Sequence, residues 1–359
     1  MFMNVPRRLG RSPFTGPQSP TQTWRYPIDT DYQGAVVGRD GTVYMGSNLG
    51  QFLALRPDGS LKWSITVPGG IAATPAVLGD GPIAFLSEGF GSGGTIYVVN
   101  PNGSPSWKFR TGEVCNCPQA SPAIGPDGTI YFGLWETAYA LTPSGSLKWS
   151  FHIPGPSNRV SEPVSVGPDG VVYLPSNYLY ALNPDGTVKW HSVDELAVAG
   201  SPAVADDGTI YVHTHDPNPT VWAFNPDGAV KWTYNIAVGC CSISIMPSIA
   251  IGADGTVYDG ETIYQDGQVG VEVALNPDGT LKWEAQYGTW PTSAAIGADG
   301  TIYFGSGTHT PTSVYALNPD GTLKWEFDDE PGYIRTPPAI GKGQRLYVGN
   351  ADALVAIGP

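Results

Sequence analysis

The sequence predicts an all-β fold, an eight-bladed β-propeller of four-stranded antiparallel blades, closed by pairing the N-terminal strand with the C-terminal blade. Three observations lead to this prediction. One sequence unit recurs along the chain and ends each time on a tryptophan. Each unit contains four short strand-like segments separated by turn residues. Incomplete units stand at both chain ends and together supply one further blade. Such periodicity is typical of repeat architectures.

The repeated unit is clearest at 121–151, 162–190 and 293–327, and its frame returns at 34–65, 74–109, 201–234 and 248–285. Its anchor tryptophans are Trp63, Trp107, Trp149, Trp190, Trp232, Trp283 and Trp325. They are 41 to 44 residues apart, with one interval of 51. One unit alone cannot bury its apolar face, so we expect neighbouring units to stack.

Each unit has four expected strands, here termed A to D, typified by PAIG, TIYFG, VYALN and LKWEF. Strand D alternates in the period-two manner of sheets, with Leu323, Trp325 and Phe327 on one side and Lys324 and Glu326 on the other. Asp-Gly pairs stand between A and B and between C and D, where tight hairpins need positive φ.

The order of the strands sorts the connections onto two sides of the ring. The A–B and C–D turns come out on one side, here called the turn face. The B–C loops and the D–A connectors between blades come out on the other, the loop face. Irregular sequence gathers at the B–C positions 87–94, 213–220, 259–270 and 306–312. Because function on a rigid scaffold tends to lie in variable loops, we expect binding at the loop face and in the funnel beneath it.

The expected domain organisation is an N-terminal extension at 1–20 and a single propeller at 21–359. The last blade combines strands A to C from 337–358 with a strand D from 22–28 that carries Trp24. Closing the ring in this way leaves no open sheet edge. We therefore expect removal of 1–28 to cost far more stability than removal of 1–18.

Composition narrows the class of partner. The formal net charge is −14, and this charge would repel nucleic acid and anionic membrane surfaces. No run approaches 18 consecutive apolar residues, so no membrane span is expected. We expect a protein or glycan partner, and the oligomeric state is not predicted.

The units AIGADGTIYFG and VYALNPDGTLKWEF resemble the PQQ-like repeat, the blade of the quinoprotein dehydrogenase superfamily of eight-bladed propellers. The resemblance extends from Trp24 to Ile357, and the Gly-His…Trp-Asp signature of WD40 repeats is missing. It implies one of two activities: oxidation of alcohols or sugars with PQQ and calcium, or a non-catalytic scaffold, as in the lipoprotein of the outer-membrane protein assembly machine. Fold alone does not choose between them.

The stretch from Met1 to Gln18 resembles the lead-in of bacterial PQQ-like repeat proteins, in which a secretion signal commonly lies upstream. This resemblance implies a periplasmic or secreted protein. The alternative is a cytoplasmic protein.

Four cysteines, Cys115, Cys117, Cys240 and Cys241, fall in expected D–A connectors. The adjacent pair Cys240-Cys241 resembles the vicinal disulfide beside the cofactor of PQQ dehydrogenases. The arginine expected soon after that pair is missing from 242–246, and Glu162, the candidate calcium ligand, precedes the pair instead of following it. We favour local disulfides, which export would allow. A Cys₄ metal site, which normally has wider spacing, and free buried thiols are the alternatives.

Two further groups of residues are candidate sites. His213 and His215 are weak metal-ligand candidates, with an exposed loop pair that binds no metal as the preferred interpretation. The funnel mouth is expected to contain residues just before strands A: Gln119, Arg159, Glu162, Trp290, Tyr333 and Arg335. The arginines suit carboxylates or sugar hydroxyls, and the aromatic rings suit stacking. The alternative is that they pair and pack within the protein.

The function predicted from these observations is a non-catalytic binding or assembly scaffold, with no catalytic residue and no cofactor. The alternative is a quinoprotein-type oxidoreductase that uses PQQ and Ca²⁺, or another small-ligand enzyme that uses the funnel.

Overall fold

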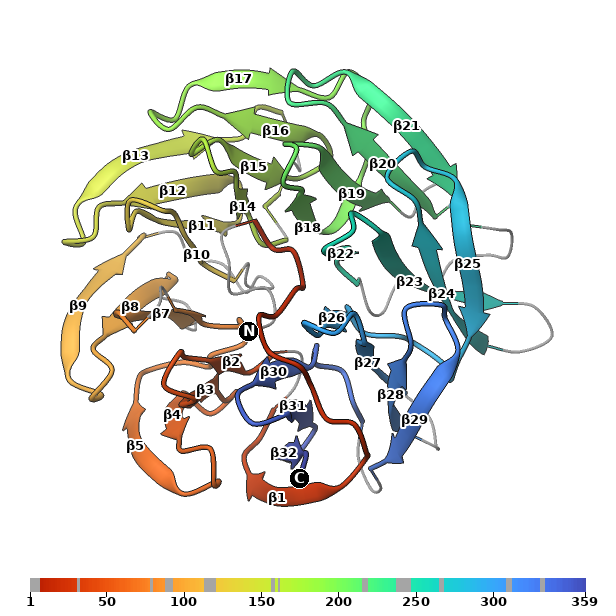
Figure 1. Ribbon diagram of the computed structural model, residues 1–359. Helices are drawn as coiled ribbons and strands as arrows, with labels where there is room; N and C mark the ends of the chain where they lie inside the picture. Colours follow the sequence, from red (N-terminus) through yellow and green to blue (C-terminus); the bar gives the residue numbers. More distant parts are fainter. Residues whose placement is uncertain are drawn as a thin grey trace.

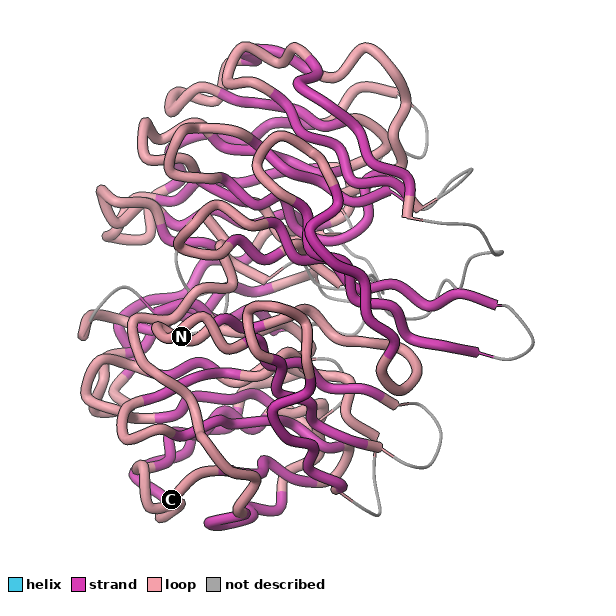
Figure 2. Tube along the Cα trace, turned by 45° about the vertical axis from the view of Figure 1, so that its right-hand side comes forward, coloured by secondary structure: helices cyan, strands magenta, loops and turns pink. Residues whose placement is uncertain are grey.

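A computed structural model of the chain shows eight four-stranded antiparallel sheets set around a central axis, and it confirms the predicted eight-bladed propeller (Figure 1). The structure describes residues 7–30, 33–77, 80–87, 93–112, 121–155, 159–160, 162–214, 219–236, 247–264, 268–307, 312–329 and 333–359. In this part of the chain there is no helix that is long and apolar enough to cross a membrane. In Figure 2 the described part of the chain consists of strands and loops.

Strands A and B form the inner half of each blade, and their side chains are almost all buried because blades contact each other on both sides there. Strand A is short in most blades: β2 (Val36–Val37), β6 (Ala76–Val77), β10 (Ala123–Ile124), β14 (Ser165–Val166), β18 (Val198–Val204), β22 (Ala250–Ile251), β26 (Ala295–Ile296) and β30 (Ala339–Gly341). Strand B is β3 (Val43–Gly46), β7 (Ile83–Ser87), β11 (Ile130–Leu134), β15 (Val172–Pro175), β19 (Ile210–Thr214), β23 (Val257–Tyr264), β27 (Ile302–Ser306) and β31 (Arg345–Asn350).

Strands C and D form the outer half, and strand D alternates between exposed and partly buried side chains, as its sequence pattern predicts. Strand C is β4 (Gln51–Leu55), β8 (Thr95–Val99), β12 (Thr137–Leu141), β16 (Leu179–Leu182), β20 (Thr220–Phe224), β24 (Gln268–Leu275), β28 (Ser313–Leu317) and β32 (Ala353–Ile357). Strand D is β5 (Leu61–Thr66), β9 (Pro105–Arg110), β13 (Leu147–His152), β17 (Val188–His191), β21 (Val230–Asn235), β25 (Leu281–Gln286), β29 (Leu323–Asp328) and, from the start of the chain, β1 (Gln22–Pro27).

The two chain ends close the ring as predicted. Strand β1 pairs with β32, so that Trp24 lies opposite Ala356 and Tyr26 opposite Leu354. Arg25 on β1 also forms ion pairs with Asp329, which follows the neighbouring blade's strand D, and with Asp352. Hydrogen bonds and charge therefore hold the N-terminal strand in a blade otherwise built from the last residues.

The repeated tryptophan links each blade to the next. Its indole Nε1 donates to the carbonyl oxygen of the proline in the next blade's C–D turn, at 2.9 to 3.1 Å, in Trp24, Trp63, Trp107, Trp149, Trp190, Trp232 and Trp283. The turn glycine is needed beneath the ring. Gly228, with φ of +90°, approaches Trp190 so closely that an added Cβ would lie 2.7 Å from the indole. The ring of blades is thus fastened by one polar contact per junction as well as by apolar packing.

The junction at ring closure uses a different acceptor. Blade 8 has no C–D turn because its strand D comes from the start of the chain, and Trp325 donates instead to the carbonyl of Pro17 at 3.0 Å. The Tyr303 hydroxyl donates to the same carbonyl at 3.2 Å. The residues before β1 therefore replace the missing turn.

Residues 7–14 lie across the inner strands on the turn face (Figure 1, red). The backbone carbonyls of Leu9 and Gly10 accept hydrogen bonds from the amides of Ile251 and Ile296, each at 2.8 Å. The Arg8 side chain extends inward and donates to the carbonyls of Ser121, Pro122 and Val164. This segment thus joins blades on opposite sides of the axis.

Lysines on strand D bind the A–B turn of their own blade. The Nζ atoms lie 3.0 to 3.8 Å from the turn aspartates in the pairs Lys62–Asp40, Lys148–Asp127, Lys189–Asp169, Lys231–Asp207, Lys282–Asp254 and Lys324–Asp299. They are partly exposed, so each contributes at most about 1 kcal/mol. Much of the acidity of the turn face is therefore neutralised locally.

Candidate functional site

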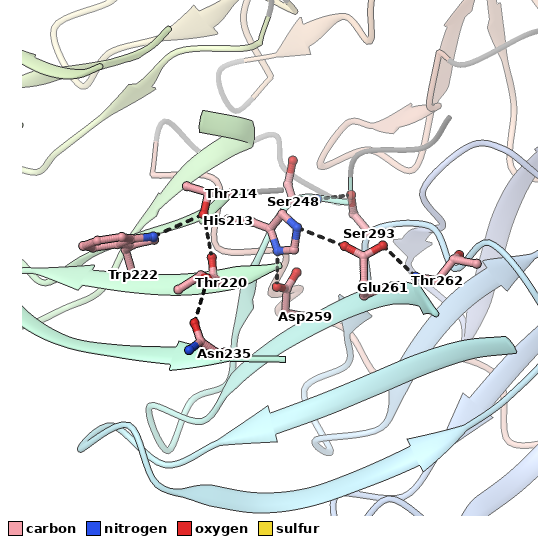
Figure 3. A network of polar contacts seen from close by, with 10 residues as sticks. All are labelled: His213, Thr214, Thr220, Trp222, Asn235, Ser248, Asp259, Glu261, Thr262 and Ser293. Carbon is pink, nitrogen blue, oxygen red and sulfur yellow. Dashed lines mark hydrogen bonds and ion pairs between the residues drawn. The ribbon is translucent and has the colours of Figure 1, made fainter. Parts of the chain in front are cut away.

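A buried charged cluster lies at the junction of blades 5 and 6 (Figure 3). His213 comes from β19 of blade 5, and Asp259 and Glu261 come from β23 of blade 6. The His213 Nδ1 lies 2.6 Å from the Asp259 carboxylate, and its Nε2 lies 3.2 Å from Glu261. The imidazole side chain is fully buried, and the two carboxylates are 0 and 2% exposed. Each ring nitrogen therefore faces a carboxylate of the next blade.

This arrangement fixes the charge of the imidazole. Burial alone would lower the pKa of His213, but the charge and hydrogen bond of Asp259, followed by those of Glu261, outweigh it and raise the pKa to about 10. Both ring nitrogens carry hydrogen in the charged form, which suits two acceptors. At neutral pH the side chain is thus an imidazolium between two carboxylates.

A third acid, Glu272, lies on β24 opposite Gly260 of β23, and thus on the other face of the blade 6 sheet from Asp259 and Glu261. It is buried, and neither of its carboxyl oxygens has a hydrogen-bond partner among the described residues. Burial, and then the nearby charge of Asp259, raise the pKa of Glu272 well above its usual value. An ionised carboxylate without compensation is costly in such a place, so the neutral form is favoured.

Glu272→Gln is expected to raise the free energy of unfolding at pH 7 by about 1–3 kcal/mol. The folded pKa of Glu272 lies above the ordinary value of 4.5, so the native state loses stability relative to the unfolded chain as pH rises above 4.5. The variant lacks this penalty, so its advantage should disappear at pH 4. Chemical denaturation at both pH values measures the difference, with the exposed Glu284→Gln as control. An advantage equal at both pH values would contradict the assignment.

The structure places His213 differently from the expected exposed loop pair. The side chain is buried because β19 carries it between two blades. His215, the other weak metal candidate, lies outside the described residues. Within the described ranges, no group of three or more His, Cys, Asp or Glu side chains has the geometry to hold a metal ion.

The acidic partners of His213 were not predicted because 259–270 was assigned to an irregular B–C loop. The structure corrects this assignment: β23 continues to Tyr264 and β24 starts at Gln268, so most of that segment is a long hairpin. The available signal was alternation, since Asp259 and Glu261 are two residues apart and share one side of a strand.

The predicted funnel residues fall into separate groups. Arg159 lies on the connector that enters blade 4, and its guanidinium is 3.9 Å from the centre of the Trp135 ring. The Arg335 guanidinium lies 5.3 Å from the ring of Tyr333, on the connector that enters blade 8. Blades 4 and 8 are half a ring apart (Figure 1), so the structure does not bring the two arginines together. Arg335 instead covers a ring of its own connector, and Arg159 covers Trp135 in the B–C turn of the preceding blade 3, both favourable cation–π geometries.

The other candidates have different surroundings. Burial raises the pKa of Glu162 to about 7, and the charge of Arg8 opposes this rise. Trp290 is buried, with a positive φ of 56°. Gln119 and the four cysteines, Cys115, Cys117, Cys240 and Cys241, lie outside the described residues, so the predicted disulfides stay a prediction.

The buried His213 cluster and the exposed side chains of the loop face differ in what they can do chemically. The side chains of His213, Asp259 and Glu261 are too buried to touch a molecule arriving from solvent, so we interpret the cluster as structural. Tyr333, in contrast, is 45% exposed on the loop face, and Arg159 is exposed there too. Exposed aromatic and arginine side chains are characteristic of protein-binding surfaces.

Comparisons with known proteins agree with this architecture. A family model described as outer membrane protein assembly factor BamB matches residues 15–161, 135–297 and 249–359. The structure of BamB from Moraxella catarrhalis is similar, with a TM-score of 0.70 and 17% identity over 94% of this chain and 99% of that one. Quinohemoprotein alcohol dehydrogenase from Comamonas testosteroni gives a TM-score of 0.75 and 12% identity over 100% and 81%.

The C-terminal WD40 domain of Sif2 is also similar, with a TM-score of 0.70 and 11% identity over 96% of this chain and 99% of that one. No curated protein matches. At these identities the structural likenesses show the fold alone.

Proposed function

Because the chain belongs to the PQQ-like β-propeller repeat family described as outer membrane protein assembly factor BamB, as its repeat units predict, we propose that it is a non-catalytic scaffold that binds a protein partner through its loop face. The proposal includes no cofactor. It also places the protein outside the cytoplasm, in keeping with the description of its family.

The observation that carries the proposal is a pair of exposed side chains on the loop face of adjacent blades 8 and 1. Tyr333, on the connector that enters blade 8, is 45% exposed and is covered on one side by Arg335. Leu49, in the B–C loop of blade 1, is 77% exposed. We call Leu49, Tyr333 and Arg335 the loop-face patch. Tyrosine and arginine dominate binding energy at many protein interfaces, and the exposed leucine on the adjacent blade adds apolar area to the same face.

Charge narrows the expected partner. The chain carries a net charge of −14, which favours a partner whose contact surface is neutral or basic. A glycan would contact the same face by stacking its sugar rings on the exposed aromatic side chain. The experiment should therefore distinguish a glycan from a protein partner.

The test is affinity capture from the extracytoplasmic fraction of the source organism, followed by measurement of the affinity for the captured protein. Tyr333→Ala is expected to weaken binding about tenfold or more. Leu281→Ala is the matched control, because Leu281 has the same 45% exposure but lies on an outer strand D. Equal binding by the two variants would contradict the loop-face assignment, and loss of capture after glycosidase treatment would favour the glycan.

The competing oxidoreductase activity is tested directly. Its support is the likeness to quinohemoprotein alcohol dehydrogenase over the whole of this chain, which concerns fold alone. Purified protein is incubated with PQQ and Ca²⁺, and binding and dye-linked alcohol oxidation are measured. We expect no turnover. Tight PQQ binding with turnover would overturn the scaffold proposal.

A further inference from the structure

A second candidate binding region lies on the turn face, opposite the loop-face patch. It is a pocket of about 880 Å³ between the N-terminal segment and the A–B turns of blades 1, 6, 7 and 8. We call it the turn-face pocket. The N-terminal segment lines it through Leu9 and Phe14, and Ile296 of β26 lines it as well. This volume is in the range of small-molecule sites.

The turn-face pocket is cationic although the protein as a whole is acidic. Arg7, Arg11, Arg39 and Lys342 all line it. Arg7 and Arg11 both form ion pairs with Asp206. Arg39 and Lys342 are exposed and form no hydrogen bond or ion pair with any described residue. Two cations therefore remain available at the mouth.

The positions of Arg39 and Lys342 depart from the repeat. Both stand immediately after the glycine that begins an A–B turn, in the neighbouring blades 1 and 8. Blades 3 to 7 have uncharged or acidic residues there, namely Pro126, Pro168, Asp206, Ala253 and Ala298. The turn therefore folds without a cation at this position, so turn geometry does not explain the two positive charges.

The interior of the turn-face pocket is largely apolar. Leu9, Tyr258 and Ile296 are buried beneath it, and Pro13 and Pro319 add further apolar surface. Asp254 is the acidic residue of the lining, and its carboxylate is paired with Lys282. An apolar interior with a few convergent charged groups is the usual character of a small-ligand site.

We propose that the turn-face pocket binds a small amphipathic organic anion. Its carboxylate would lie toward Arg39 and Lys342, since the planar guanidinium suits a carboxylate, and its apolar part would lie along Leu9 and Phe14. The occupant is a small molecule because the net charge of −14 repels an acidic protein or a polyanion at long range, whereas a single carboxylate bears little of that cost. This site is independent of the scaffold role proposed for the loop face.

Isothermal titration calorimetry with octanoate tests the proposal, with octanamide as the neutral probe of the same shape. Octanoate is expected to bind the full-length protein with a stoichiometry of one, about tenfold tighter than octanamide. The double variant Arg39→Gln/Lys342→Gln should lose most of this preference. Lys148→Gln/Lys189→Gln removes the same charge from the same face, in blades 3 and 4 and outside the pocket, and should bind like the wild type.

The outcomes separate clearly. Absence of octanoate binding, equal binding of octanamide, or the same loss in both double variants would overturn the proposal. The altered side chains of the first variant are exposed, so its melting temperature should match that of the wild type and its loss of binding reports the site.

Discussion

Replacing His213 by leucine is expected to lower the free energy of unfolding by about 3–5 kcal/mol. The substitution removes the positive charge that lies 2.6 Å from Asp259 and 3.2 Å from Glu261 at a fully buried junction. The two carboxylates then repel each other where water cannot screen them. The same change at His152, whose side chain is 68% exposed on β13, should shift stability by less than about 0.5 kcal/mol.

The pH dependence of the wild type provides a second measurement of the same contact. The folded pKa of His213 is raised from 6.5 to about 10, so the native state holds this proton more tightly than the unfolded chain does. Its contribution is complete below about pH 6.5 and is lost as pH rises through 10. Denaturation of H213L at pH 7 and pH 10 should therefore show a smaller difference from the wild type at the higher pH.

A charge-removed background tests the cause. If like-charge repulsion is responsible, Asp259→Asn and Glu261→Gln should recover much of the loss when added to H213L. A triple variant as unstable as H213L would show that packing of the ring, rather than its charge, matters at this junction.

The fold could be predicted because its determinants are local. Each repeat unit of about forty residues contains its own Asp-Gly turns and alternating strands. Because the unit recurs along the chain, a weak sequence pattern in one copy is supported by the others. What the repeat could not show is which atoms meet across a junction. The tryptophan was predicted as an anchor, but its acceptor is a turn carbonyl of the next blade, as in the bond from Trp63 to Pro101.

The charged cluster shows why the site was harder to predict than the fold. His213 and Asp259 are 46 residues apart, and only the stacking of two blades brings them together. The segment from Asp259 onward was expected to be an irregular loop, whereas it continues β23 into a buried junction. A buried carboxylate is stable only with a partner, and the partner belongs to another repeat.

The N-terminal segment does not contain the repeat unit, so its sequence predicts only an extension before the propeller. Its contacts at Arg8, Pro17 and the turn-face pocket involve blades far away in the sequence, and the hydrogen bond from Trp325 to Pro17 spans 308 residues. No periodic pattern could identify them, because the segment occurs once. Residues 1–18 therefore contribute stabilising contacts of their own, in addition to those of the strand that carries Trp24.

Removal of residues 1–18 is expected to lower the free energy of unfolding by roughly 4 kcal/mol or more. Burial of Leu9 and packing of Phe14 against the core contribute about 1.5–3 kcal/mol each. The deletion also takes away the carbonyl of Pro17, so Trp325 and Tyr303 lose their shared acceptor. The ion pairs of Asp206 are lost as well, but they are exposed and add little.

Three proteins measured by chemical denaturation decide the question: the full chain, a truncation of 1–18 and a truncation of 1–28. The longer deletion also removes β1 and opens the ring, so it should fail to fold or melt far lower than the other two. A synthetic peptide of residues 5–20, added to the shorter truncation, should restore part of its stability in proportion to peptide occupancy. If the truncation of 1–18 unfolds at the same denaturant concentration as the full chain, the segment lies on the turn face without stabilising the propeller. Its contribution to the turn-face pocket would then not be needed to close the ring.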